Sequence, residues 1–135
     1  MGPNDAQIVR VFSREPGAAI ADTTLNPQKD GEIVLEAEAG RTLHAQQGAY
    51  RVTLVVRDVS DGSVIPVVGS GEVKGQFEQN GQGWEKPSQP FTFTLSSNVL
   101  SQHAGHLAQA YGSVLYTSTE PGATFAVSPM FMILP

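Results

Sequence analysis

Two histidines spaced three residues apart, His103 and His106, are the side chains of this sequence that best fit metal chemistry. Residues three apart on a helix are neighbours, so both imidazoles would reach a single cation. Zinc sites in proteins normally use three or four protein ligands, however, and the remaining histidine, His44, is distant in the sequence. The pair therefore indicates either a metal-binding protein or two solvated histidines on an exposed helix.

The segment that carries both histidines predicts a short helix over residues 98–110. Its apolar residues recur at helical intervals, namely Leu100, Ala104, Leu107, Ala108 and Tyr111. Ser97 or Asn98 can cap the first turn, and Gly105 weakens the helix by about 1 kcal/mol relative to alanine. We expect this helix to connect two sheets through its apolar stripe, with the histidines on its solvated flank.

The loop over residues 77–90 holds the single tryptophan of the chain, Trp84, among two glycines and two prolines. Polar side chains surround it at Asn80, Gln82 and Glu85. An aromatic ring flanked by amide and carboxylate groups is suited to stacking on a sugar, and binding residues often lie on loops. The loop therefore predicts a carbohydrate-binding site, unless Trp84 folds back to close one end of the core.

Two further groups offer weaker metal hypotheses. Met130 and Met132 alternate near the end of the chain, and thioethers with imidazoles bind Cu(I), although methionines in a strand usually fill a core. Asp58 and Asp61 lie in the stretch RDVSDG, without the spacing of an EF-hand calcium loop. A turn-stabilising role is the simpler interpretation of these two aspartates.

Catalytic signatures are weak in this sequence. It has no cysteine nucleophile, and the stretch GSGE at 69–72 has the wrong spacing for a nucleophile elbow. Glu36 and Glu38 alternate with apolar residues, which places them on the solvent side of a strand and not across a cleft. We therefore predict a protein that is not an enzyme and that needs no cofactor.

Alternation of apolar and polar residues at period two predicts a series of short strands. Between turn signals such as Asp-Gly and Asn-Gly, the candidates cover 7–12, 18–25, 32–38, 49–59, 63–68, 72–79, 90–96, 111–118 and 124–134. In the strand over 49–59, Tyr50, Val52, Leu54 and Val56 share one face. Strands with one buried and one solvated face are typical of packed sheets.

The number and spacing of these strands predict an all-β fold, an antiparallel Greek-key sandwich of seven to nine strands with the one connecting helix. The general rhythm resembles that of immunoglobulin and fibronectin type III domains, but the Cys…Trp…Cys signature is missing. The resemblance therefore covers the fold pattern and no family residues. At 135 residues, the chain is expected to form a single domain over 1–135.

The charges are unevenly distributed along the chain. The formal net charge of −5 argues against a nucleic-acid partner, and no apolar run is long enough for a membrane span. All eight Lys and Arg residues lie at or before Lys86, and Glu120 is the single formal charge beyond it. This charge-poor third indicates residues that are buried in the core, buried in a protein contact, or solvated by neutral polar groups.

The leading functional hypothesis is a non-catalytic interaction or assembly module. Its partner would be another protein or a second copy of the chain, bound through the charge-poor C-terminal third. If the final strand lies at a sheet edge, it could pair between chains, because no lysine blocks it. Carbohydrate binding through Trp84 and metal binding through His103 and His106 remain the alternatives, and the compartment stays open.

Overall fold

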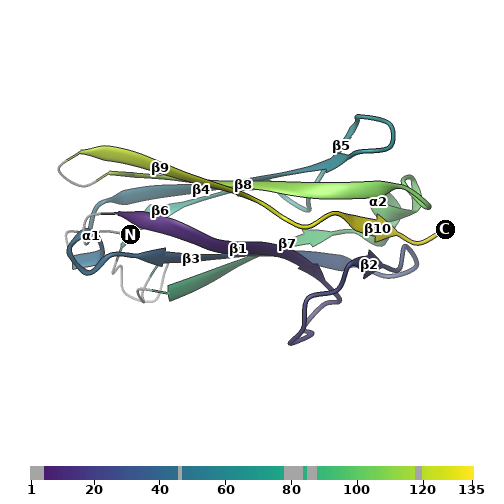
Figure 1. The fold of residues 1–135 in the computed structure, drawn as a ribbon, viewed down its shortest axis with the longest axis horizontal. Coiled ribbons are helices and arrows are strands. Elements are labelled where there is room, and N and C mark those ends of the chain that lie inside the picture. Colours follow the sequence, from purple (N-terminus) through teal and green to yellow (C-terminus); the bar gives the residue numbers. More distant parts are fainter. Residues whose placement is uncertain (1–4, 46, 78–83, 85–87, 118–119) are drawn as a thin grey trace.

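Two β-sheets pack face to face in the computed structural model, which describes residues 5–45, 47–77, 84, 88–117 and 120–135 (Figure 1). The smaller sheet has the order β1-β3-β7, from strands Ala6–Arg14, Gly31–Ala39 and Ser88–Leu95. The larger sheet has the order β2-β10-β8-β4-β5, with β6 beside β4 and β9 beside β8. The fold is a mainly antiparallel immunoglobulin-like β-sandwich, as the alternation predicted.

The elements of the larger sheet range from two residues to eleven. They are β2 Thr24–Leu25, β4 Ala49–Asp58, β5 Val64–Ile65, β6 Glu72–Gln76, β8 Leu107–Thr117, β9 Pro121–Val127 and β10 Phe131–Ile133. Pairing is antiparallel throughout this sheet except between β10 and β2. Strand β8 is its central element, since it pairs with β4 along most of its length and with β9 along its second half.

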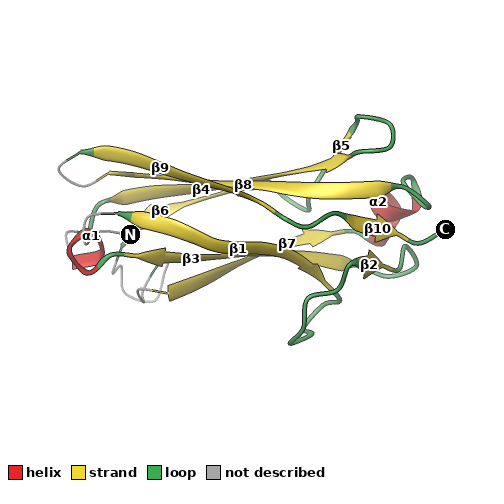
Figure 2. Cartoon of the chain, in the orientation of Figure 1, coloured by secondary structure: helices red, strands yellow, loops and turns green. Residues whose placement is uncertain are grey.

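Two short helices connect the sheets at opposite ends of the sandwich (Figure 2). Helix α1, Arg41–Ala45, follows β3 and leads into β4, and helix α2, Ser97–Ser101, follows β7 and leads into β8. The chain therefore crosses from the smaller sheet to the larger one at each helix. Within the described residues, neither helix is long and apolar enough to cross a membrane.

The helix predicted over 98–110 connects the sheets as expected, but its extent was wrong. It ends at Ser101, and the left-handed backbone of Gly105 (φ 81°) does not allow an α-helix to continue to residue 110. From Leu107 onward the chain is strand β8, where exposed Leu107 and Tyr111 alternate with buried Ala108 and Ala110. The apolar spacing fitted both periods, and the glycine and the sheet pairing decided between them.

The core is formed by the inward faces of both sheets. The predicted inward sets, Tyr50 to Val56 on β4 and Phe91 to Leu95 on β7, are buried. At the α1 end, the rings of Tyr50, Phe77, Trp84 and Phe91 pack together with centroid distances of 5.0–5.9 Å. Such tilted and edge-on ring pairs add to the stabilisation from apolar burial.

Candidate functional site

The outer face of the larger sheet carries several exposed apolar side chains. Antiparallel register aligns three outward rows there: Tyr111 beside Val127, Ser113 beside Phe125, and Leu115 beside Ala123. Strand β4 adds Thr53 and Val55 in the row beyond β8. We call this the β4–β8–β9 face and define it by these residues: Thr53, Val55, Tyr111, Ser113, Leu115, Ala123, Phe125 and Val127.

Large apolar side chains on this face are open to solvent. Phe125 is 76% exposed, Val127 56% and Val55 44%. Single exposed apolar residues are ordinary on protein surfaces, but a contiguous group on one sheet face marks an interaction surface. The face therefore exposes a group of neighbouring apolar side chains on β4, β8 and β9.

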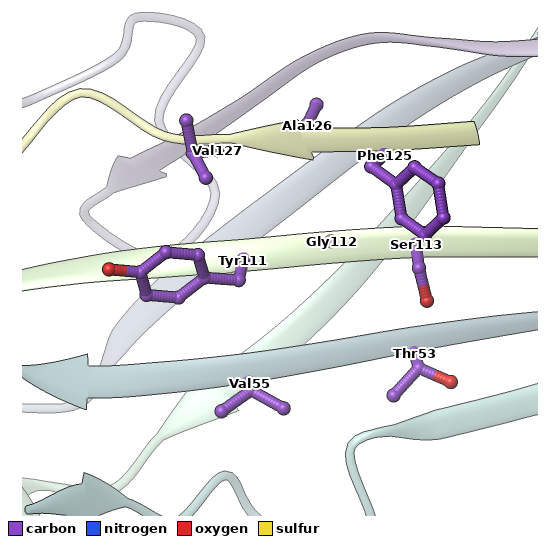
Figure 3. A pocket seen from close by; sticks show the side chains of 8 residues that line it. All are labelled: Thr53, Val55, Tyr111, Gly112, Ser113, Phe125, Ala126 and Val127. Carbon is purple, nitrogen blue, oxygen red and sulfur yellow. The ribbon is translucent and has the colours of Figure 1, made fainter.

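A shallow hollow of about 490 Å³ lies on the β4–β8–β9 face. In Figure 3, the rings of Tyr111 and Phe125 stand at its two ends, and Val55 and Thr53 of β4 border it on the side away from β9. A projecting ring beside a recess gives the face both a knob and a hole. A second apolar surface with a matching projection and recess could pack closely against this face.

The face as defined carries no formal charge. The nearest charged positions on the outward side are Arg51 and Arg57 on β4, together with Glu72 and Lys74 on β6, which lie opposite Thr53 and Arg51. The charge-poor C-terminal third thus supplies β8 and β9. Along each of these strands, every second residue faces inward, and the residues between them lie on the outer side, which holds the β4–β8–β9 face. A contact here would bury no unpaired charge, which is the main penalty in burying polar surface.

The strand expected over 124–134 divides into an edge part and an inner part. The chain expected to run as one strand over 124–134 is interrupted at Ser128–Met130, and β10 lies between β8 and β2. Strand β9 forms the edge beside β8 instead, and it faces β1 of the other sheet, where the Ile8 amide reaches Thr124 Oγ1 at 3.4 Å. Of the strand expected over 124–134, the part in β9 therefore lies at a sheet edge, and the part in β10 lies inside the sheet.

A second group of chemically active side chains lies at the other end of β4. The Nδ1 atoms of His103 and His106 lie 2.7 and 2.5 Å from the same oxygen, Oδ2 of Asp58. Asp61 follows in the β4–β5 turn, with its Oδ2 3.9 Å from His106 Nδ1. We call these four residues the Asp–His cluster.

Asp58 is the buried centre of the Asp–His cluster, with no exposed surface. Burial by itself would raise the pKa of this carboxyl group, but hydrogen bonds from His106, His103 and the Asp61 amide outweigh it and lower the pKa to about 2. The carboxylate therefore stays ionised at neutral and mildly acidic pH. The pKa of Asp61 is also lowered, through its hydrogen bonds from Ser63.

The folded chain brings two carboxylates, Asp58 and Asp61, to the histidine pair. His103 and His106 lie on the turn between α2 and β8 and not on a helix, and this turn packs against the end of β4. A signal was present in the strand pattern, because Asp58 continues the inward series Tyr50, Val52, Leu54 and Val56. A charged residue at a core position of a strand calls for a partner.

Within the tryptophan loop, the structure describes Phe77, Trp84 and residues 88–90. Trp84 is fully buried in the aromatic cluster, and its carbonyl oxygen lies 3.0 Å from His44 Nε2. Its ring therefore has a packing role and offers no open face to a sugar. Asn80, Gln82 and Glu85 lie outside the described residues, so they stay predictions.

The two methionines of the copper hypothesis do not fill the core. Met130 is 50% exposed and Met132 is 37% exposed, because β10 turns its outward position to solvent at Met132. The core positions of β10 are Phe131 and Ile133 instead.

Comparisons with known proteins support the fold. No family model matches the chain, and no curated protein matches it. Among solved structures, it is similar to AggA, the major subunit of aggregative adherence fimbriae type I from Escherichia coli, with 6% identity, a TM-score of 0.52 and 96% of each chain covered. At this identity the likeness shows a shared β-sandwich fold and nothing more.

Two other solved structures are less similar. The periplasmic chaperone SfaE has 9% identity and a TM-score of 0.44, with 93% of this chain and 56% of the chaperone covered. Spo0M, a sporulation control protein from Bacillus subtilis, has 8% identity and a TM-score of 0.44, with 96% and 49% covered. The chain thus spans about half the length of these two proteins.

Proposed function

We propose that this chain is a non-catalytic assembly module that associates with a second copy of itself through the β4–β8–β9 face. The observation that carries the proposal is Phe125, which projects from an uncharged sheet face with three quarters of its surface exposed beside a hollow. A buried phenylalanine side chain contributes about 1.5–3 kcal/mol relative to an exposed one. Association is the simplest way for this face to gain that free energy.

A second copy is the occupant that the face fits best. Knob and hole lie side by side on one surface, so a two-fold axis between two faces would place each Phe125 in the hollow of the other chain. The contact would be a sheet-on-sheet packing, with about 10 Å between the two sheets. Because the face is uncharged, two identical copies bring no like charges together at the centre of the contact.

The fold is compatible with this role but does not carry it. AggA, whose fold is similar, is named as the major subunit of a fimbria, so this type of sandwich occurs in a protein that assembles. The same fold supports many unrelated functions, and the proposal for this chain therefore rests on its own exposed residues.

Sedimentation velocity over a wide range of protein concentrations tests the proposal. We expect the wild-type chain to shift from monomer to dimer as concentration rises, and the Phe125→Asp variant to remain monomeric. The matched control is Ile20→Asp, because Ile20 is 78% exposed and lies in the loop between β1 and β2, away from the face. A wild-type chain that stays monomeric throughout would refute self-association.

The variants also separate this face from other contact surfaces. If Phe125→Asp and Ile20→Asp associate as well as the wild-type chain, the dimer uses another surface and the proposal is wrong. Circular dichroism of each variant confirms that the sandwich is intact, so that loss of association is read as loss of the contact. An exposed position should tolerate aspartate within about 0.5 kcal/mol in the monomer.

A further inference from the structure

The Asp–His cluster lies at the α2 end of the sandwich, where three chain segments meet. Asp58 ends β4, Asp61 lies in the turn that follows, and both histidines lie in the turn between α2 and β8. One ligand atom from each of the four side chains lies within 4.8 Å of the other three. Two backbone-linked contacts hold the turns together, Val59 amide to Leu107 carbonyl at 2.8 Å and Leu107 amide to Ser60 Oγ at 3.0 Å.

We propose that Asp58, Asp61, His103 and His106 form a structural site for a divalent transition-metal ion, with zinc as the ion of choice. The ligand set is two imidazole nitrogens and two carboxylate oxygens, which zinc accepts in four-coordinate sites. Calcium and magnesium prefer oxygen ligands alone, so the two histidines discriminate against them. This site is separate from the β4–β8–β9 face and does not depend on self-association.

The spacing of the ligand atoms is close to what a tetrahedral ion requires. With zinc–ligand bonds of about 2.0–2.1 Å, neighbouring ligand atoms lie roughly 3.3 Å apart. The two Nδ1–Asp58 distances, 2.7 and 2.5 Å, are shorter than that, and the Nδ1–Asp61 distance of 3.9 Å is longer. Rotation of the exposed Asp61 side chain would shorten the longer distance, and the two shorter ones would have to lengthen by about 0.6–0.8 Å as the ion takes the place of the Nδ1 hydrogens.

The charge balance of the cluster also favours a cation. Asp58 is a fully buried carboxylate, and Asp61 adds a second negative charge next to it. Among the described residues, neither carboxylate forms an ion pair with a lysine or an arginine. Buried charges in proteins are normally paired or bound to metals, and here imidazole nitrogens already point at the buried oxygen.

Bound zinc would connect the β4–β5 turn to the turn between α2 and β8. These turns are about 45 residues apart in the sequence, so the ion would act as a cross-link between distant segments. Metal binding to the folded chain alone raises its stability by mass action. The site would therefore act on the stability of the sandwich and on the order of its α2 end.

Zinc titration of the untagged chain, after treatment with EDTA, tests the site. We expect one zinc ion per chain by isothermal titration calorimetry, with a rise in the melting temperature. Nitrogen-15 NMR of the imidazole rings should show coordination through Nδ1 of His103 and His106. His44 is the internal control in the same spectrum, because it lies in the α1 helix at the other end and its resonances should not change.

Two variants test the ligands without removing the buried carboxylate. His106→Ala and Asp61→Asn change partly or fully exposed side chains, so both variants should fold. Loss of supporting contacts around metal ligands weakens binding by 10–100-fold, and we expect loss of the His106 ligand to weaken zinc affinity by at least about 100-fold. Glu72→Gln is the matched control, since it removes a carboxylate from β6 and should leave zinc affinity unchanged.

The outcomes distinguish a metal site from a hydrogen-bonded cluster. No stoichiometric binding, or binding that His106→Ala and Asp61→Asn leave unchanged, would refute the proposal and leave Asp58 as a carboxylate held by hydrogen bonds. Binding without any change in the melting temperature would refute the structural role. None of these results affects the sedimentation experiment, because the cluster does not include any residue of the β4–β8–β9 face.

Discussion

Two phenylalanines on outward-facing strand positions, Phe12 and Phe125, have opposite surroundings. Phe12 lies on β1 of the smaller sheet, opposite Val34 and outside the main core, yet only 7% of it is exposed. The guanidinium of Arg10 lies 4.2 Å from its ring centroid and pairs with Glu36 at 2.9 Å. Phe125 on the larger sheet is 76% exposed.

The difference follows from where the long charged side chains lie. Arginine and lysine cover apolar surface with their methylene stems while their charged ends stay in water. The smaller sheet has Arg10 and Arg14, each paired with a glutamate of β3. The strands β8 and β9 come from the part of the chain beyond the last lysine, so the face they form has no such cover. A charge distribution along the sequence thus becomes a difference between the two faces of the molecule.

Truncation of Phe12 and Phe125 should give the largest difference in unfolding free energy between the two faces. We expect Phe12→Ala to lower the free energy of unfolding by about 3 kcal/mol, because a nearly buried ring leaves a cavity. Phe125→Ala should change it by less than about 0.5 kcal/mol in the monomer. Urea unfolding at low protein concentration measures both, and equal losses would show that the two rings are not as differently surrounded as described.

A charge placed on the β4–β8–β9 face should weaken association. Leu115 is 40% exposed on β8, and Leu115→Lys would bury an unpaired ammonium group in the proposed contact. We expect the dissociation constant to rise at least about tenfold, which corresponds to 1.4 kcal/mol. Val64→Lys is the matched control on β5 of the same sheet, and analytical ultracentrifugation compares the two. Equal weakening by both would place the contact elsewhere on the sheet.

Removal of the Arg10 side chain should expose Phe12, so that the outer face of the smaller sheet becomes more apolar, like the β4–β8–β9 face. Arg10→Ala deletes an exposed ion pair, worth up to about 1 kcal/mol, and the stem that covers Phe12. We expect a loss of about 1 kcal/mol in unfolding free energy together with stronger binding of an apolar fluorescent dye. Arg57→Ala on β4 should change neither quantity by as much, and an equal response would mean that Arg10 does not cover Phe12.

Salt should have the smallest effect. An uncharged contact loses little when charges are screened, so raising the ionic strength to about 1 M should change the dissociation constant by less than about threefold. Light scattering across a salt series measures this. A large drop in association with salt would show that Arg51, Lys74 or other charged neighbours provide the contact and not the apolar centre.

Much of the fold was predictable because strand patterns are local. The inward series on β4 and β7 could be read from alternation, since each depends on the backbone of a single strand. The segment after α2 was not predictable in the same way, because its apolar spacing suits a helix and a strand alike. Pairing of Leu107–Thr117 with β4 over nine register positions decided in favour of the strand.

For the candidate sites too, local pattern predicted some features, and tertiary neighbours decided the others. From composition, the charge-poor C-terminal third indicated residues buried in the core, buried in a protein contact or solvated by neutral polar groups. The exposed apolar face that it forms depends on β8 and β9 being neighbours in the larger sheet. The loop over residues 77–90 was predicted to bind a ligand because polar residues surround Trp84 in the sequence. In space its ring packs against Tyr50 of β4, Phe91 of β7 and Phe77 at the start of the loop.

The sequence by itself determined the strand content, the absence of cysteine chemistry and the unequal distribution of charge, because these are properties of composition and local pattern. Only the tertiary structure brought His103 and His106 to Asp58, a residue 45 positions earlier. It also decided which apolar side chains stay open to solvent. Both outcomes depend on which distant strands and turns become neighbours, and a single local pattern does not contain that information.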